Sequence, residues 1–221
     1  MPRRRVVLAN KEIYHIYNKA VANEDIFNGT RYQSNALSLL DYYKKPQKLR
    51  YSKFKQLTSE NKRAYLEALK VVEPYVEVMV FALMPNHYHL LVRQISDNGI
   101  QKFIANFQNS FAKFYNLKNK RRGSLFINAF KSKRVENDSL LLHISRYIHL
   151  NPATSYIMKP EDLEKSYITS FSEYLDKNRR GITNKDLILN IVGSAENYKK
   201  FVLDRVDYQR ELKRIRPLIL E

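Results

Sequence analysis

Two of the five histidines of this chain stand one residue apart, in His87-Tyr88-His89. Residues at positions i and i+2 of a β-strand share one face and lie roughly 6–7 Å apart. If this segment is a strand, both imidazoles point the same way and can bind one metal ion, while Tyr88 packs on the other side. Arg93 would share the histidine face and could approach a phosphate. The alternative is a pair of histidines that make only structural hydrogen bonds.

A second group of polar residues, His143, Tyr147 and Asn151, has helical spacing. Residues at i, i+4 and i+8 lie along one face of a helix over about 12 Å. A tyrosine one turn from an asparagine offers a nucleophile beside a possible metal ligand. The alternative is ordinary amphipathic packing of the helix. The chain holds 16 tyrosines, so one tyrosine at this position is weak evidence for a nucleophile. His15 and His143 are minor candidates for the same site.

Four strands are expected to position these residues. Residues 12–17 alternate and are rich in β-forming types, and residues 76–84 form a continuous apolar run. Pro85-Asn86 is a turn signal, so residues 87–94 should return antiparallel to the preceding strand. Residues 125–135, after the break at Gly123, indicate a further strand.

The helices are expected between and after these strands. Apolar spacing predicts helices over 32–43, from Thr58 or Ser59 to about 71, and through an apolar stripe from Ile100 to Phe114 capped by Asp97 or Asn98. Residues 44–56 read as a basic loop. Asp138 is the predicted N-cap of a helix from 139 to about 150 that Pro152 ends.

This order predicts an α+β fold, a ferredoxin-like or RRM-like antiparallel sheet with helices on one or both faces. We expect a catalytic domain over residues 1–165. Residues 166–221 should form a basic, mainly helical C-terminal extension.

The charge balance points to a polyanionic partner. Lys and Arg number 39 against 22 acidic residues, which gives a net charge of +17. Such a surplus favours nucleic acid, although it also serves solubility. Residues 98–135 carry nine basic residues and no acid, and another basic stretch runs from Lys199 to Arg216. The candidate DNA-binding residues are Arg3, Arg4, Arg5, Arg93, Lys113, Lys118, Lys120, Arg121, Arg122, Lys131, Lys133 and Arg134.

The absence of cysteine excludes disulfides and thiolate metal sites. Any metal must be held by imidazole, amide or carboxylate groups or by substrate oxygens, a set that suits Mg²⁺ or Mn²⁺. No apolar run approaches the ~18–20 residues needed to span a bilayer. We therefore expect a cytoplasmic protein without a membrane partner.

The stretch FALMPNHYHLLV, residues 81–92, resembles the HUH motif region of REP-associated tyrosine transposases, within the HUH single-tyrosine transposase family. Residues 14–27 resemble the opening strand of that family, residues 123–152 its second half through RYIHLNP, and residues 169–175 a downstream segment. One departure is Ser124, where the family often has a histidine.

The resemblance implies a metal-dependent DNA transposase. His87, His89 and Asn151 would bind a divalent ion, and Tyr147 would attack the scissile phosphate. The product would be a 5′-phosphotyrosine and a free 3′-hydroxyl, which another strand can use to reverse the attack. The implied substrate is single-stranded DNA carrying a hairpin, and the enzyme could act as a homodimer.

Two other interpretations stay open from the sequence. A non-catalytic RRM-like nucleic-acid-binding module would share the basic surface but would need no pairing of Tyr147 with the histidines. A separation of about 6–8 Å or less between them distinguishes the two. A replication-initiating or relaxase-type HUH enzyme would usually be larger and carry partner domains.

Overall fold

A computed structural model of the chain describes residues 7–127, 129–176 and 181–206. Its centre is a four-stranded antiparallel sheet in the order β2-β3-β1-β4. The strands are β1 (Ile13–Lys19), β2 (Val76–Met84), β3 (His87–Gln94) and β4 (Lys131–Val135). The β2–β3 hairpin forms where Pro85-Asn86 predicted it.

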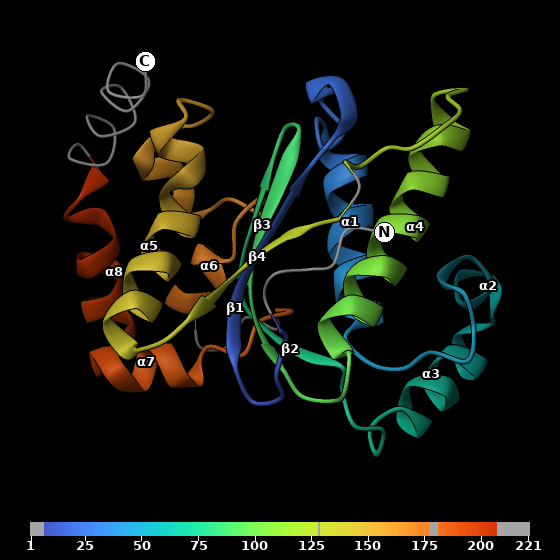
Figure 1. Cartoon of the computed structure of the whole chain (residues 1–221), viewed down its shortest axis with the longest axis horizontal. Helices are drawn as coiled ribbons and strands as arrows, with labels where there is room; N and C mark the ends of the chain where they lie inside the picture. The colour runs from blue at the N-terminus through green and yellow to red at the C-terminus, as the bar shows by residue number, and fades with distance from the viewer. Residues whose placement is uncertain (1–6, 128, 177–180, 207–221) are drawn as a thin grey trace.

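Helices cover both faces of the sheet (Figure 1). On one side lie α1 (Thr30–Tyr43) and α4 (Gly99–Lys118), with α2 (Tyr51–Gln56) and α3 (Ser59–Ala68) beyond them. On the other side lie α5 (Asp138–Thr154), α6 (Phe171–Leu175), α7 (Asp186–Val192) and α8 (Ala195–Leu203). Two short 3-10 turns, Val21–Asn23 and Pro160–Glu164, complete the described elements. The predicted α+β sandwich is confirmed, with C-terminal helices present.

The alternation of β3 divides its side chains between two cores. Tyr88, Leu90 and Val92 are fully buried with the residues of α1 and α4. Leu91, on the other face, packs with Ile148 of α5. His87 and His89 have the parity of Leu91, so they lie on the α5 side, as the strand period of two requires.

Several predicted boundaries were wrong. Residues 44–56 contain α2, whose Phe54 packs beside Tyr42 and Tyr65 with ring centroids 5.0 and 5.6 Å away. The last strand begins only at Lys131, because the Leu125–Phe126 side chains are buried in the α1/α4 core and this segment makes one isolated bridge, to Ala20 just after β1. The helix that Thr58 caps ends at Ala68 rather than near residue 71.

The N-cap of α4 is one of the two predicted residues, whereas the N-cap of α5 differs from expectation. Asn98 is the N-cap of α4, but its backbone is left-handed and its side chain makes no capping hydrogen bond. The Asp97 carboxylate instead accepts from Asn10 Nδ2 at 2.6 Å. Asn137, not Asp138, caps α5, with its Oδ1 accepting from Leu140 N at 2.8 Å.

Pro152 does not end α5. The helix continues to Thr154, because proline near a helix end removes one backbone donor and the backbone N–H groups that follow find other acceptors. Ser155 N donates to Asn151 O at 3.0 Å and Ile157 N to Pro152 O at 3.0 Å. Asn151 therefore lies inside the helix, where a helical turn fixes its position relative to Tyr147.

The second core joins α5 to residues beyond 165, including Phe171, Tyr174 and Tyr198. The predicted division into residues 1–165 and 166–221 stays a proposal about domains. Of the helices in the described part of the chain, none is long and apolar enough to cross a membrane. Arg3, Arg4, Arg5 and most of the basic stretch from Lys199 to Arg216 lie outside the described residues.

A buried polar cluster fixes α8 against α5. His149 is fully buried, with Nε2 2.7 Å from Ser170 Oγ and Nδ1 2.9 Å from the Tyr198 hydroxyl. The same hydroxyl lies 3.0 Å from Ser145 Oγ. Burial lowers the pKa of His149 to about 3, so the ring is neutral and one of its nitrogens must accept a hydrogen bond.

Replacing Tyr198 by phenylalanine should lower the free energy of unfolding by about 1–3 kcal/mol, because buried polar atoms lose a partner. Urea denaturation followed by circular dichroism measures the change. Tyr167, 68% exposed, gives the control: Tyr167→Phe should change stability by less than about 0.5 kcal/mol. Equal effects of the two substitutions would contradict the structural role of the cluster.

Candidate active site

Strands β1 and β3 bring four aromatic or imidazole side chains to the face that α5 covers. Tyr17 pairs with His89 in the antiparallel register, and Lys19 with His87. The rings of His87 and His89 have centroids 5.0 Å apart, so the two imidazoles are neighbours on one face, as predicted. His15 stacks on His89 with centroids 5.1 Å apart.

Helix α5 places Tyr147 against this face. The ring centroid of Tyr147 lies 5.6 Å from that of His89 and 6.2 Å from that of His15, both edge-on. The separation from His89 is within the range that distinguishes a paired site from a plain binding module. The tyrosine and the histidines of one chain thus lie together without a second copy of the protein.

Asn151 follows Tyr147 by one helical turn and is 2% exposed. Its Oδ1 accepts from Ser155 Oγ at 3.3 Å. Within the described residues, no group of three or more His, Cys, Asp or Glu side chains could hold a metal ion. The predicted donors here are the imidazoles of His87 and His89, with the Asn151 amide on the adjoining helix, and His15 is a third imidazole on the same face.

Each of the paired histidines has a polar partner at its Nδ1 atom. His87 Nδ1 lies 2.6 Å from Asn86 Oδ1. His89 Nδ1 lies 2.9 Å from His15 Nε2, in a buried contact. Burial, and to a lesser extent the charge of Lys133 on the next strand, lower the pKa of His15 to about 4.

The predicted basic residues divide into two groups. Three arginines have carboxylate partners within the chain: Arg93 with Glu77 (3.1 Å), Arg121 with Glu24 (2.9 Å) and Arg134 with Glu12 (2.8 Å). The predicted lysines and Arg122 are exposed. Lys113 and Lys118 stand on α4, on the opposite side of the sheet from α5.

Lys131 and Lys133 are the predicted lysines nearest the histidines. They lie on edge strand β4 opposite Tyr17 and His15, and so on the same face of the sheet. Lys131 Nζ is 6.0 Å from the centroid of the Tyr17 ring. These two side chains give the open border of the histidine face a positive charge.

Tyr17 and Asn86 were not predicted from the sequence as members of this candidate site, and His15 was predicted only as a minor member. The ring of Tyr17 stacks on His89 with centroids 5.7 Å apart. The alternation of residues 12–17 indicated which side chains of this strand share a face, but not that the strand would pair with β3. Only strand pairing joins Tyr17 and His15 to the histidines, whereas Asn86 directly precedes His87 in the sequence.

Ser124, the position that departs from the family pattern, makes local contacts. Its hydroxyl donates to Phe126 O at 2.8 Å, and its carbonyl accepts from Arg121 Nη1 at 2.9 Å. These bonds hold the turn that leads toward β4.

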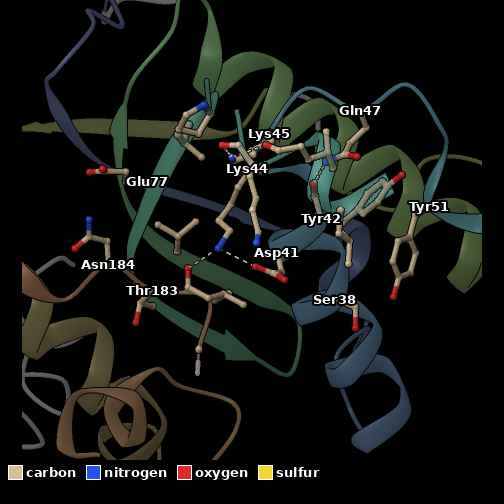
Figure 2. A pocket seen from close by; sticks show the side chains of 18 of the residues that line it. Ser38, Asp41, Tyr42, Lys44, Lys45, Gln47, Tyr51, Glu77, Thr183 and Asn184 are labelled. Carbon is tan, nitrogen blue, oxygen red and sulfur yellow. Dashed lines mark hydrogen bonds and ion pairs between the residues drawn. The ribbon is translucent and has the colours of Figure 1, made fainter. Parts of the chain in front are cut away.

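A hollow of about 620 Å³ lies elsewhere, between the ends of α1 and α3, the start of β2 and residues 181–184 (Figure 2). The histidine pair and Tyr147 do not line it. Lys44 Nζ points into this hollow but contacts Asp41 at 2.8 Å and donates to Ile182 O at 3.0 Å. The hollow is separate from the candidate active site.

Comparison with known proteins assigns this arrangement to a class. Residues 47–151 match the model of the family described as "Transposase IS200 like", and this stretch includes both histidines, Tyr147 and Asn151. Among solved structures, the chain is similar to one described as "Structure of the REP associates tyrosine transposase bound to a REP hairpin". The TM-score is 0.54 at 14% identity, covering 83% of this chain and 91% of the other. No curated protein sequence matches the chain.

Residues 47–151 are thus similar to the IS200-like transposases, and the fold is that of the solved REP-associated tyrosine transposase. The resemblance inferred from the sequence is confirmed. Both comparisons support a transposase role and, in general, a DNA-cleaving enzyme.

Proposed function

We propose that the protein cleaves and rejoins single-stranded, hairpin-bearing DNA through a 5′-phosphotyrosine intermediate at Tyr147, with a divalent ion bound by His87, His89 and Asn151. One observation carries the proposal: Tyr147 on α5 lies 5.6 Å, ring to ring, from His89 in the same chain. A binding module would have no need of that pairing.

The donors on this face fit a small divalent cation. Two neutral imidazoles and an amide oxygen are acceptable ligands for Mg²⁺ or Mn²⁺, and the remaining positions would be filled by water and phosphate oxygens. When bound there, such an ion polarises the scissile phosphate and stabilises its developing negative charge.

Tyr147 is the group that forms the covalent bond. Its Oη would attack phosphorus, the bond from phosphorus to the 3′-oxygen would break, and the phenolic proton would pass to solvent while the departing oxygen takes one up. The new phosphodiester retains the energy of the old one, so a 3′-hydroxyl can reverse the attack without ATP. Helix α5 holds the ring by packing, and oriented attack requires such a fixed nucleophile.

A hairpin-bearing strand is the substrate that best suits this site. The solved relative is described as bound to a REP hairpin, and the net charge of +17 favours a phosphate backbone. We assign Lys131 and Lys133 to the strand near the reactive phosphate. The other exposed basic residues of the predicted set remain candidates for the rest of the DNA. The possible homodimer stays a prediction.

Lys131→Ala together with Lys133→Ala should reduce the salt dependence of DNA binding. Each phosphate contact to a single strand contributes about 0.7 to the log–log slope, so losing both should flatten it by about 1.4. Fluorescence anisotropy over a range of salt concentrations measures the slope. Lys53→Ala with Lys55→Ala on α2, across the sheet, is the matched control and should leave it unchanged. A slope unaffected by the β4 pair would remove β4 from the DNA path.

A strand-transfer assay tests the function itself. A labelled hairpin-bearing donor strand and an unlabelled strand with a free 3′-hydroxyl would be incubated with the protein and Mn²⁺, without ATP. We expect cleaved and joined products. Hydrolysed ends without joining would indicate a nuclease, and DNA binding without any cleavage would indicate the RRM-like module.

A further inference from the structure

The two paired histidines share a feature that does not depend on a bound ion: each has its Nδ1 atom held by a side chain of the protein. Asn86 holds His87 at 2.6 Å, and His15 holds His89 at 2.9 Å. A neutral imidazole carries its proton on one nitrogen and a lone pair on the other. Whatever fixes the proton at Nδ1 therefore leaves the lone pair on Nε2.

We propose that Asn86 and His15 are positioning residues that hold His87 and His89 with the proton on Nδ1, so that each presents the Nε2 lone pair to the divalent ion. The inference rests on the proposed function. It concerns two residues that would not touch the ion: Asn86 would position His87, and His15 would position His89.

The assignment for His87 follows from the Asn86 amide. Asn86 Nδ2 donates to Asn23 O at 3.4 Å, which orients the amide so that its oxygen faces His87. An amide oxygen only accepts hydrogen bonds, so the proton between the two residues belongs to His87 Nδ1. His87 Nε2 then carries the lone pair.

The assignment for His89 depends on His15. A hydrogen bond between two neutral rings needs one donor and one acceptor, and His15 can be either. If His15 Nε2 accepts, His89 Nδ1 donates and His89 Nε2 carries a lone pair. If His15 Nε2 donates, His89 Nε2 carries a proton and has no lone pair for an ion. Ligation through His89 Nε2 therefore selects the first arrangement.

The surroundings of His15 and His89 hold the two rings in a fixed orientation. His15 and His89 are 9% and 7% exposed. The His15 ring is also packed against Tyr17, with centroids 5.1 Å apart, and edge-on to Tyr147. Because partners of this kind fix ring orientation and tautomer, their loss typically weakens metal binding about 10- to 100-fold.

Mn²⁺ binding, measured from the electron paramagnetic resonance signal of the free ion, tests the proposal without DNA or turnover. His15→Leu fills the space but removes the acceptor, and should weaken binding about 10- to 100-fold. His15→Gln places an amide oxygen near the position of Nε2 and should restore affinity to within about threefold of the wild type. Asn86→Ala should weaken binding similarly, and Asn86→Asp, which keeps an oxygen, should not. His143→Leu, an exposed histidine on α5, is the control and should bind as the wild type does.

Nitrogen-15 spectra of the imidazoles give a second readout on the metal-free wild-type protein. The proposal requires His87 and His89 to carry their protons on Nδ1. A proton on Nε2 of His89 would overturn it, and so would wild-type affinity in a folded His15→Leu variant. If His15→Leu fails to fold, the glutamine variant must bind Mn²⁺ and the wild-type spectrum must show the Nδ1 proton, or the proposal fails. A wild-type protein that binds no Mn²⁺, or binds it independently of His89, would instead refute the proposed metal site.

Discussion

Tyr147→Phe is expected to abolish the covalent protein–DNA adduct while leaving the fold and DNA binding intact. The substitution removes one oxygen from a half-buried ring that packs against His89 and His15. Without that oxygen no phosphotyrosine can form, and the cleavage rate should fall by roughly 10⁴-fold or more, the scale of losing a covalent nucleophile. The measurement uses a hairpin-bearing strand labelled at either end, run on a denaturing gel. Only the label on the fragment 3′ of the cut should migrate with the protein.

Tyr17→Phe is the matched control for this experiment. Tyr17 is a second tyrosine on the same face, stacked on His89 with centroids 5.7 Å apart. It lies on the rigid sheet rather than on α5, and we expect its variant to form the adduct. An adduct that persists in Tyr147→Phe and disappears in Tyr17→Phe would identify Tyr17 on β1 as the nucleophile.

Removing the divalent ion or one of its histidines should have the second largest effect. Cleavage should stop in EDTA and return when Mg²⁺ or Mn²⁺ is added in excess. Stabilisation of transition-state charge by an ion is worth several kcal/mol, and each 1.4 kcal/mol is tenfold in rate. His87→Ala and His89→Ala should therefore each slow cleavage by at least about 100-fold.

The choice of variants separates loss of the ion from loss of the fold. His89 is buried and hydrogen-bonded to His15, so His89→Ala should also lower stability, by about 1–3 kcal/mol. His87 is half-exposed and starts its strand, so His87→Ala tests the ion with less structural cost. His143 is an exposed residue of α5 whose ring contacts Arg146 and Phe201, and His143→Ala should retain full activity. Cleavage that survives EDTA would end the metal hypothesis.

The sequence alone determined the parts of the protein that depend on local periodicity. The apolar run of residues 76–84, the turn signal at Pro85-Asn86 and the returning segment 87–94 predict the β2–β3 hairpin. The strand period of two predicts that His87 and His89 share a face opposite Tyr88, which the structure confirms. Helical spacing likewise aligned Tyr147 with Asn151. These predictions succeed because a period of 2 or 3.6 residues is a property of the backbone and needs no tertiary contact.

The boundaries that failed were decided by packing. Part of the predicted loop forms α2 because Phe54 packs against Tyr42 and Tyr65. Strand β4 begins later in the sequence than predicted, because Leu125 and Phe126 are buried in the α1/α4 core. Asn137 displaces Asp138 as the cap of α5, since both residue types serve as N-caps and the path of the chain decides which one fits.

Only the tertiary structure decided the composition of the candidate site. Tyr17 and His15 join the histidines because β1 pairs with β3 across more than seventy residues of sequence, in a register that no local pattern encodes. The distance from Tyr147 to His89 likewise depends on how α5 docks on the sheet. Arg93, Arg121 and Arg134 looked equivalent to the exposed lysines, yet each meets a carboxylate: Arg121 and Arg134 meet one from a distant segment, and Arg93 meets the facing residue of the β2–β3 hairpin. Contacts between segments far apart in sequence arise from the packing of the whole fold, whereas the spacing within one segment sets only which side chains share a face.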